Sequence, residues 1–190
     1  MGSTGELRSV ALVALHLQAV GVSSIGLNVH ETGLQFANQA QPCPSLRGRI
    51  LANALAEHAV VVVPGFFATR PDGTMVSLGR GGSDFSAVLL AIGLCAERCE
   101  LIKDVPGYFK DDPRRNARAP HLPALSFGEA VRMAERGCEL VQPRALRAAD
   151  EANLPLVIRS MDERAPVSVI SRGARRGSAE RHDEPVAAEA

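Results

Sequence analysis

Short apolar strands alternate with longer helical segments along most of this chain, and this alternation limits the fold more than any other feature. A β-branched run at residues 59–63 ends at Pro64-Gly65, which is typical of a strand buried on both faces. Hydrophobic spacing predicts further strands at residues 22–29, 74–78, 99–103 and 154–160, and helices at residues 5–20, 45–58, 85–97, 126–136 and 142–151. Because strands that alternate with helices build parallel sheets, we expect an α/β protein with a mainly parallel sheet.

Two of the expected helices carry start signals. Ser45 is the expected N-cap of the helix at residues 45–58. Ser126 is followed three residues later by Glu129, the spacing of a capping box. Residues 171–190 are rich in Arg, Glu, Ala and Gly and offer little to bury, so we expect a domain over residues 1–170 and a disordered polar tail.

Charge and composition exclude several classes of protein. The 21 basic and 21 acidic residues balance, which argues against a nucleic-acid partner or a polybasic membrane surface. No signal peptide opens the chain and its apolar runs are too short to cross a membrane, so a cytoplasmic location is expected. The four cysteines lack zinc-site spacing, which favours free thiols and predicts no protein-held metal.

A glycine loop between a strand and a helix is suited to an anionic ligand. The loop reads Gly79-Arg80-Gly81-Gly82-Ser83-Asp84. Adjacent glycines let backbone N–H groups approach a ligand, and the start of the following helix favours negative charge. Arg80 adds a forked donor for a carboxylate or phosphate. The loop lacks the Lys-Ser/Thr of the P-loop and the third glycine of GxGxxG, so a plain strand-to-helix turn explains it equally well.

Two later segments also have both a structural and a functional explanation. Asp104 follows the strand at residues 99–103, and ligands bind at such strand ends in open parallel sheets. An Asp before Val-Pro-Gly is equally typical of a turn. The run Asp111-Asp112-Pro113-Arg114 offers Arg114 to phosphates, although such a run alone is usually a solvated loop.

Taken in order, these segments resemble the aspartate kinase branch of the amino acid kinase family. The matching blocks are LGRGGSDFSAVLLA, LIKDVPGYF, DDPR, LSFGEAVRMAERG and LVQPRAL, and the resemblance runs from residue 3 to about residue 171. It implies a three-layer α/β/α sandwich with a mainly parallel sheet. We expect this sandwich to be incomplete at its N-terminal side, because the family's opening Lys-Phe-Gly-Gly segment has no counterpart here.

The resemblance implies a reaction and an acid-binding site. The reaction is transfer of the γ-phosphoryl group of ATP, with Mg²⁺, to the β-carboxylate of L-aspartate. Arg80 and Asp84 are the implied catalytic residues, Arg80 on a substrate carboxylate and Asp84 orienting the lysines around the phosphoryl group. The acid substrate is expected at Arg80, Gly81, Gly82 and Ser83, and its α-ammonium group at Glu6.

The resemblance also implies a nucleotide site. The expected contacts are Lys103, Asp104, Phe109, Arg114, Glu139 and Leu140. Here the family's Gly-Ala-Lys is Gly137-Cys138-Glu139, and Lys103 replaces the usual Thr. Positive charge on the transferred oxygens drives phosphoryl transfer, and neither family lysine has a counterpart. Lys103 and Lys110 are the only lysines of the chain, and we consider both as replacements.

Three functions stay open on this basis. The leading one is an aspartate kinase, and the others are a phosphotransferase for another acid and a non-catalytic nucleotide- or amino-acid-binding regulator. Glu139 and the missing lysines favour the regulator. The absent segment normally supplies strands, so we expect an unpaired sheet edge, and hence self-association or a partner that carries the missing lobe, as in a split kinase.

Overall fold

The computed structural model describes residues 2–36, 45–46, 49–116, 118–138 and 140–173. The helices are α1 (Gly2–Ala19), α2 (Ile50–Glu57), α3 (Gly82–Gly93), α4 (Phe127–Glu135) and α5 (Pro143–Glu151). The strands are β1 (Ser24–Gly26), β2 (Leu34–Gln35), β3 (Ser45–Leu46), β4 (Val60–Val62), β5 (Phe67–Thr69), β6 (Met75–Ser77), β7 (Cys99–Lys103), β8 (Tyr108–Phe109), β9 (His121–Leu122), β10 (Ala124–Leu125), β11 (Leu156–Ser160) and β12 (Ser168–Ile170).

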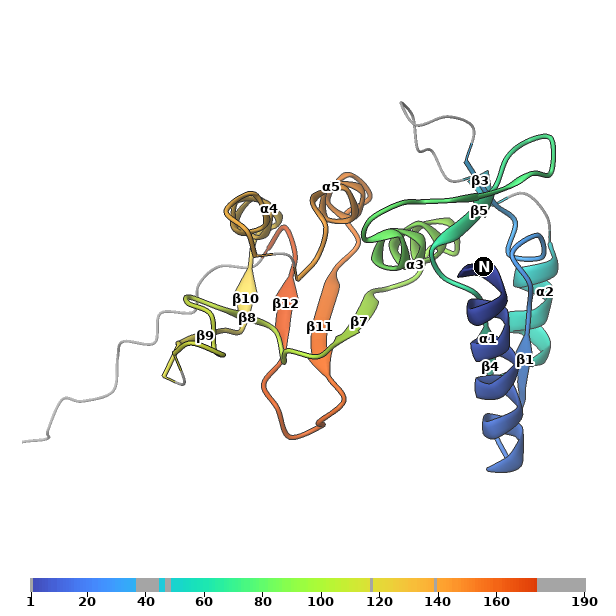
Figure 1. The fold of residues 1–190 in the computed structure, drawn as a ribbon, viewed down its shortest axis with the longest axis horizontal. Coiled ribbons are helices and arrows are strands. Elements are labelled where there is room, and N and C mark those ends of the chain that lie inside the picture. Colours follow the sequence, from blue (N-terminus) through green and yellow to red (C-terminus); the bar gives the residue numbers. More distant parts are fainter. Residues whose placement is uncertain (1, 37–44, 47–48, 117, 139, 174–190) are drawn as a thin grey trace, which may run out of the picture.

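The sheet that ends at the candidate site has the order β10-β12-β11-β7. β7 pairs in parallel with β11 over its full length, whereas β12 is antiparallel to β11 and parallel to β10. Helices α3, α5 and α4 lie in a row along one side of this sheet (Figure 1). The α/β class is confirmed, and the sheet is mixed because β11 and β12 run in opposite directions.

The N-terminal half holds the smaller sheets β1-β4 and β3-β2-β5-β6, and β8 pairs with β9 further along the chain. The predicted strand at residues 59–63 is present as β4, but the prediction that this strand is buried on both faces is wrong. All three valines of β4 are only half-buried. Among the described strands β4 has β1 as its single neighbour, so one edge of β4 lies open.

Several predicted boundaries also need correction. Ser45 is not a helix cap: it lies in β3, and α2 begins at Ile50 after an Arg49 N-cap that makes no side-chain cap bond. The strand expected at residues 22–29 shortens to β1, and α1 begins three residues before the expected Gly5. The two- and three-residue strands β8, β9, β10 and β12 were not predicted, because runs this short show no periodicity.

The predicted cap of α4 is confirmed. The Ser126 hydroxyl accepts a hydrogen bond from the Glu129 N–H at 3.3 Å, and the Ser126 N–H donates to the Glu129 carboxylate at 2.9 Å. These reciprocal bonds satisfy the backbone N–H groups of Ser126 and Glu129 at the start of the helix, and so they fix where α4 begins.

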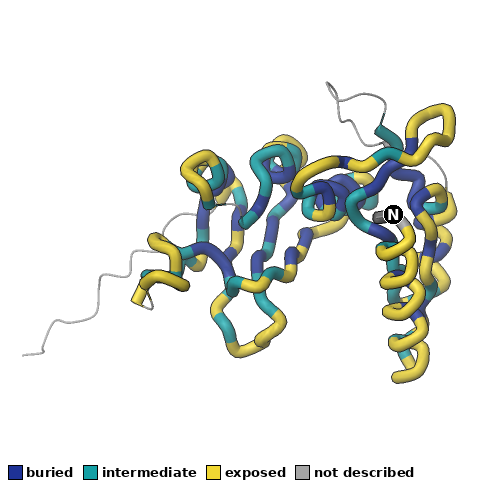
Figure 2. The backbone as a smooth tube through the Cα atoms, in the orientation of Figure 1, coloured by how far each residue is buried: buried dark blue, intermediate teal, exposed yellow. Residues whose placement is uncertain are grey.

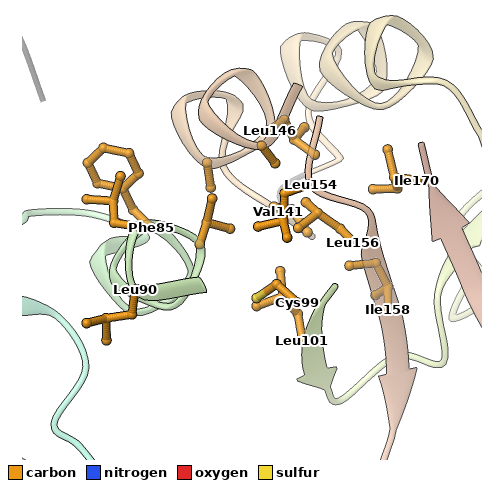
Figure 3. Packing of buried hydrophobic residues seen from close by; sticks show 14 of the residues in the cluster. Phe85, Leu90, Cys99, Leu101, Val141, Leu146, Leu154, Leu156, Ile158 and Ile170 are labelled. Atoms are coloured by element: carbon orange, nitrogen blue, oxygen red, sulfur yellow. The ribbon is translucent and has the colours of Figure 1, made fainter. Parts of the chain in front are cut away.

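One apolar core joins α3, α4 and α5 to the β7–β11 pair. Phe85, Leu101, Leu146, Leu156 and Ile158 are among its fully or almost fully buried members. Figure 3 shows the side chains of Leu146 in α5, Leu101 in β7 and Leu156 in β11 packed between the helices and the sheet. By contrast, α1 is exposed along most of its length (Figure 2). The core therefore holds rigid the region in which the glycine loop and the end of β7 lie.

The start of the expected tail is attached to the fold. The Ser171 N–H donates to the Leu125 carbonyl at 3.1 Å, and Arg172 pairs with Asp150 at 2.8 Å. Residues 174–190, most of the expected tail, lie outside the described residues. No helix in the described ranges is both long and apolar enough to span a bilayer.

Cys95, in the connection between α3 and β7, and Cys99, the first residue of β7, should differ strongly in reactivity. Cys95 is exposed, whereas Cys99 is buried. Burial, with the negative charges of Asp84 and Glu100, raises the pKa of the Cys99 thiol from 9.0 to about 11. Since the thiolate is the nucleophile, iodoacetamide at pH 8 should label Cys99 at least ~100-fold more slowly than Cys95. Labelling of Cys99 should accelerate as the pH rises toward that pKa.

Peptide mass spectrometry over a labelling time course measures each site separately. In urea, where both thiols are exposed, the two rates should converge. Equal rates in the folded protein would contradict the burial of Cys99.

Candidate functional site

The glycine loop forms a tight turn between β6 and α3. Gly79 and Gly81 have φ angles of 74° and 65°, in the left-handed region that side chains disfavour, and Gly81 is the N-cap of α3. Gly82 is buried, and a Cβ atom at this position would lie 2.7 Å from the Phe66 ring. Arg80 and Ser83 are exposed beside these glycines, so their side chains are available to a ligand.

An arginine from a distant segment holds this loop in place. The Arg144 guanidinium donates to the carbonyl oxygens of Leu78 and Arg80, the latter at 3.0 Å, and it lies 4.5 Å from the centre of the Phe85 ring. Burial lowers the pKa of Arg144, but an arginine keeps its charge in proteins. Arg144 thus fixes both ends of the turn that carries Arg80.

Arg144 is a functional residue that was not predicted from the sequence. One signal was present: Arg144 lies in the first turn of α5, where the helix dipole opposes a positive charge. A cation at that position indicates a partner elsewhere in the fold. The partner could not be named from the sequence, because Leu78 lies 66 positions earlier.

Asp84 and Lys103 form an ion pair between the loop and the end of β7. The Lys103 ammonium donates to both carboxylate oxygens of Asp84, at 2.6 and 2.7 Å. Both side chains are largely shielded from solvent, with 19% of Lys103 and 15% of Asp84 exposed. The pair connects the first turn of α3 with the last residue of β7.

An open pocket of about 780 Å³ begins at the carboxyl end of β7. Its wall contains five of the six residues expected to contact a nucleotide: Lys103, Asp104, Phe109, Arg114 and Leu140. Their roles in binding stay a prediction, but the fold brings them together around one space. Among the described lining residues, five side chains are cationic and three are acidic, a balance that favours an anionic ligand.

The loop at residues 111–116 folds back onto the end of β7. Arg114 pairs with Asp104 at 2.5 Å, and the Asp112 carboxylate accepts the backbone N–H of Arg114 at 2.9 Å. The Arg114 and Asp104 side chains are 69% and 76% exposed, so their pairing adds little to stability. The pairing does hold the Arg114 guanidinium at the rim of the pocket, where a bound anion can compete with Asp104 for this group.

A buried serine supports the turn behind the pocket. The Ser168 hydroxyl donates to the Leu122 carbonyl at 2.7 Å and accepts the Tyr108 N–H at 2.8 Å. Gly107 is packed against it at φ 125°, where a Cβ atom would lie 2.4 Å from the Ser168 oxygen. His121 Nε2 lies 3.1 Å from the same oxygen, and burial lowers the pKa of that imidazole.

For two expected site residues, contact with these features stays an expectation. Glu139 lies outside the described residues, so its position next to the nucleotide stays an expectation. Glu6 is half-buried in the second turn of α1. Within the described ranges, no hydrogen bond or ion pair joins Glu6 to the glycine loop, and its contact with an ammonium group also stays an expectation.

The described residues contain no cluster of three or more His, Cys, Asp or Glu side chains that would hold a metal ion. Mg²⁺ that is bound together with phosphates takes phosphate oxygens and water as most of its ligands. Asp104, Asp111 and Asp112 at the pocket are the carboxylates that could complete such a shell.

Comparison with known proteins gives consistent matches. A family model described as the amino acid kinase family matches residues 1–160. The aspartokinase of Geobacillus stearothermophilus is 36% identical over 164 residues, which is 85% of this chain and 40% of that protein. The chain thus spans about 40% of the length of the curated relatives that it matches.

Solved structures agree with the sequence matches. E. coli aspartokinase III, solved in complex with aspartate and ADP, superposes with a TM-score of 0.76 at 30% identity, over 88% of this chain and 39% of that one. Aspartate kinase from Synechocystis gives a TM-score of 0.74 at 32% identity, over 89% of this chain and 28% of that one.

Proposed function

Because the chain belongs to the amino acid kinase family, we propose that it carries the nucleotide-binding part and a share of the acid-binding site of an aspartate kinase. The proposed reaction transfers the γ-phosphoryl group of ATP to the β-carboxylate of L-aspartate. The observation that supports it best is the position of the pocket. Lys103, which lines the pocket, pairs with Asp84 of the glycine loop, so a nucleotide in the pocket and an acid at the loop would lie next to each other.

The two halves of the proposed site have different tasks. The cationic rim of the pocket, with Arg114 and Lys110, would bind the phosphates of ATP. The glycine loop would present backbone N–H groups and the Arg80 side chain to the carboxylates of aspartate. Phosphoryl transfer depends chiefly on holding donor and acceptor in line, which two adjoining rigid subsites achieve.

Mg²⁺ that arrives with ATP would neutralise charge on its phosphate oxygens. No step of the proposal requires a metal ion held by the protein alone. Free thiols and ATP as substrate also support a cytoplasmic location for the reaction.

Formation of an acyl phosphate tests the proposed function. The purified chain is incubated with ATP, Mg²⁺ and L-aspartate, hydroxylamine converts any aspartyl phosphate into a hydroxamate, and ferric iron makes this product visible as a coloured complex. The Arg80→Ala variant should lose about 10- to 100-fold in activity, because a charged contact to the substrate disappears. Arg80 is exposed, so this loss would not come from unfolding.

Arg164 provides the matched control, since it is an exposed arginine in the loop after β11 and outside the pocket. Arg164→Ala should form hydroxamate at the rate of the unmodified chain. If the unmodified chain forms no more product than Arg80→Ala, the stand-alone kinase proposal fails. ATP binding without product would then favour the regulatory homologue.

We further propose that the chain self-associates or binds a polypeptide that supplies the remaining lobe. The open edge of β4 and the exposed apolar side chains of α1, including Leu12, Val13 and Leu15, support this proposal. Light scattering at high protein concentration should detect a species larger than 20.1 kDa. A single species of monomer mass at all concentrations would contradict self-association.

A further inference from the structure

We infer that Lys103 is the cation that contacts the transferred phosphoryl group in this chain, and that Asp84 is the residue that positions it. This inference rests on the proposed function, because it assigns a role within the same site. It concerns a lysine at a position where the aspartate kinase pattern has threonine.

The location of Lys103 is the first argument. Lys103 is the last residue of β7 and lines the pocket, while Asp84 belongs to the glycine-loop end of α3. The ion pair therefore lies where the proposed nucleotide and acid subsites meet. In phosphoryl transfer the moving group passes between these subsites, so charge develops at this junction.

The geometry of the pair is the second argument. An ammonium group has three N–H donors, and the two oxygens of Asp84 engage two of them at 2.6 and 2.7 Å. No other described residue accepts from the third donor, which we assign to a ligand oxygen in the pocket. Lys103 lines the pocket and 19% of its side chain is exposed, while its ammonium group is oriented by Asp84.

The other candidate cations of the pocket are less constrained. Lys110 is exposed after β8, and Arg114 is 69% exposed and paired with Asp104. Both must be ordered when a ligand binds, whereas Lys103 is ordered in advance. A preorganised donor stabilises a transition state most, because no reorganisation accompanies the reaction.

A purely structural role explains the pair less well. Removing two charges from water is costly, and shielded ion pairs often contribute nothing to stability relative to apolar residues. β7 and α3 already share the apolar core through Leu101 and Phe85. A shielded lysine aimed at a pocket is therefore better explained by a ligand.

The proposed step balances without a proton. One carboxylate oxygen of aspartate forms a bond to Pγ, and the bond between Pγ and the bridging oxygen of ADP breaks, with its electron pair going to ADP. Lys103 stays protonated throughout and donates a hydrogen bond to a γ-oxygen, whose negative charge it balances.

Nucleotide binding separates this role from a structural one. Titration calorimetry with ATP and with ADP, both with Mg²⁺, is carried out on the unmodified chain, Lys103→Met and Arg98→Met. Arg98 precedes the same strand and pairs with Glu100 at 2.7 Å on the surface, so Arg98→Met removes one positive charge away from the pocket. Asp84→Asn/Lys103→Met removes both partners, in case an unpaired Asp84 unfolds the single variant.

We expect Lys103→Met and the double variant to bind ATP about 10- to 100-fold more weakly, while ADP affinity changes by no more than about threefold. Lys103→Arg should restore most of the ATP affinity, and Arg98→Met should bind both nucleotides as the unmodified chain does. Equal weakening for ATP and ADP, or unchanged ATP affinity, would overturn the inference and leave the proposed function standing. An unmodified chain that binds neither nucleotide would overturn both.

Discussion

Replacing Gly81 by alanine is expected to lower the free energy of unfolding by about 2–4 kcal/mol and to abolish the geometry of the glycine loop. Gly81 has a φ of 65°, which strains any residue with a Cβ atom. The added methyl group would also lie 1.9 Å from Cγ and 3.0 Å from Cβ of Gln142. Gln142 would have to leave its place at the start of α5, beside the Arg144 that holds the loop.

Gly79 offers a matched control within the same loop. Its φ of 74° carries a similar backbone strain, but a Cβ atom there would meet nothing within 4 Å. Gly79→Ala should therefore cost only about 1–2 kcal/mol, the backbone part of the effect. Urea denaturation followed by circular dichroism measures both variants.

The double variant Gly81→Ala/Gln142→Ala isolates the steric part. The Gln142 side chain makes no cap bond to α5, so its truncation alone should cost little. In a double-mutant cycle, the pair should recover most of the difference between Gly81→Ala and Gly79→Ala. Additive effects in this cycle would show that Gly81 and Gln142 do not touch.

Truncation of Ile158 to alanine is the second large expected effect, a loss of about 2–5 kcal/mol of unfolding free energy. Ile158 is fully buried in β11, where it pairs with Leu101 on one side and Ser168 on the other. The cavity left by alanine cannot close, because strands flank it on both edges. A domain of this size is stable by only about 5–15 kcal/mol, so the loss is a large fraction.

Ile102 is the matched control for this truncation. It lies in the neighbouring strand β7, but 49% of it is exposed. Ile102→Ala should cost no more than about 1 kcal/mol, since little apolar surface leaves the core. Equal losses for Ile158→Ala and Ile102→Ala in urea denaturation would contradict the burial pattern of the sheet.

Taken together, Ile158→Ala and Lys103→Met distinguish a residue that stabilises the fold around the site from a residue that contacts the nucleotide. Ile158→Ala should reduce stability without changing the nucleotide selectivity of the remaining folded protein. Lys103→Met should do the reverse, with altered ATP binding in a folded chain. If both variants changed the same property, whether stability or nucleotide selectivity, this division of roles would be wrong.

The amino-acid sequence alone determined the types and order of the main elements, because these depend on neighbours a few residues apart. The β7 strand was predicted at residues 99–103 as observed, and the Ser126 cap marks the start of α4. Glycines at 79, 81 and 82 and the segments that follow were sufficient to indicate a ligand loop and a family. The short strands β8, β9, β10 and β12 escaped prediction, because strands of this length form only where a partner strand lies alongside.

Tertiary structure alone decided which distant side chains meet. The contact of Lys103 with Asp84 spans 19 positions, and that of Arg144 with Leu78 spans 66. Both depend on the packing of α3 and α5 over the sheet whose β7 and β11 strands run in parallel, and no local pattern encodes that packing. The sequence therefore raised the question of which lysine contacts the transferred phosphoryl group, and the ion pair between Asp84 and Lys103 supplied the candidate.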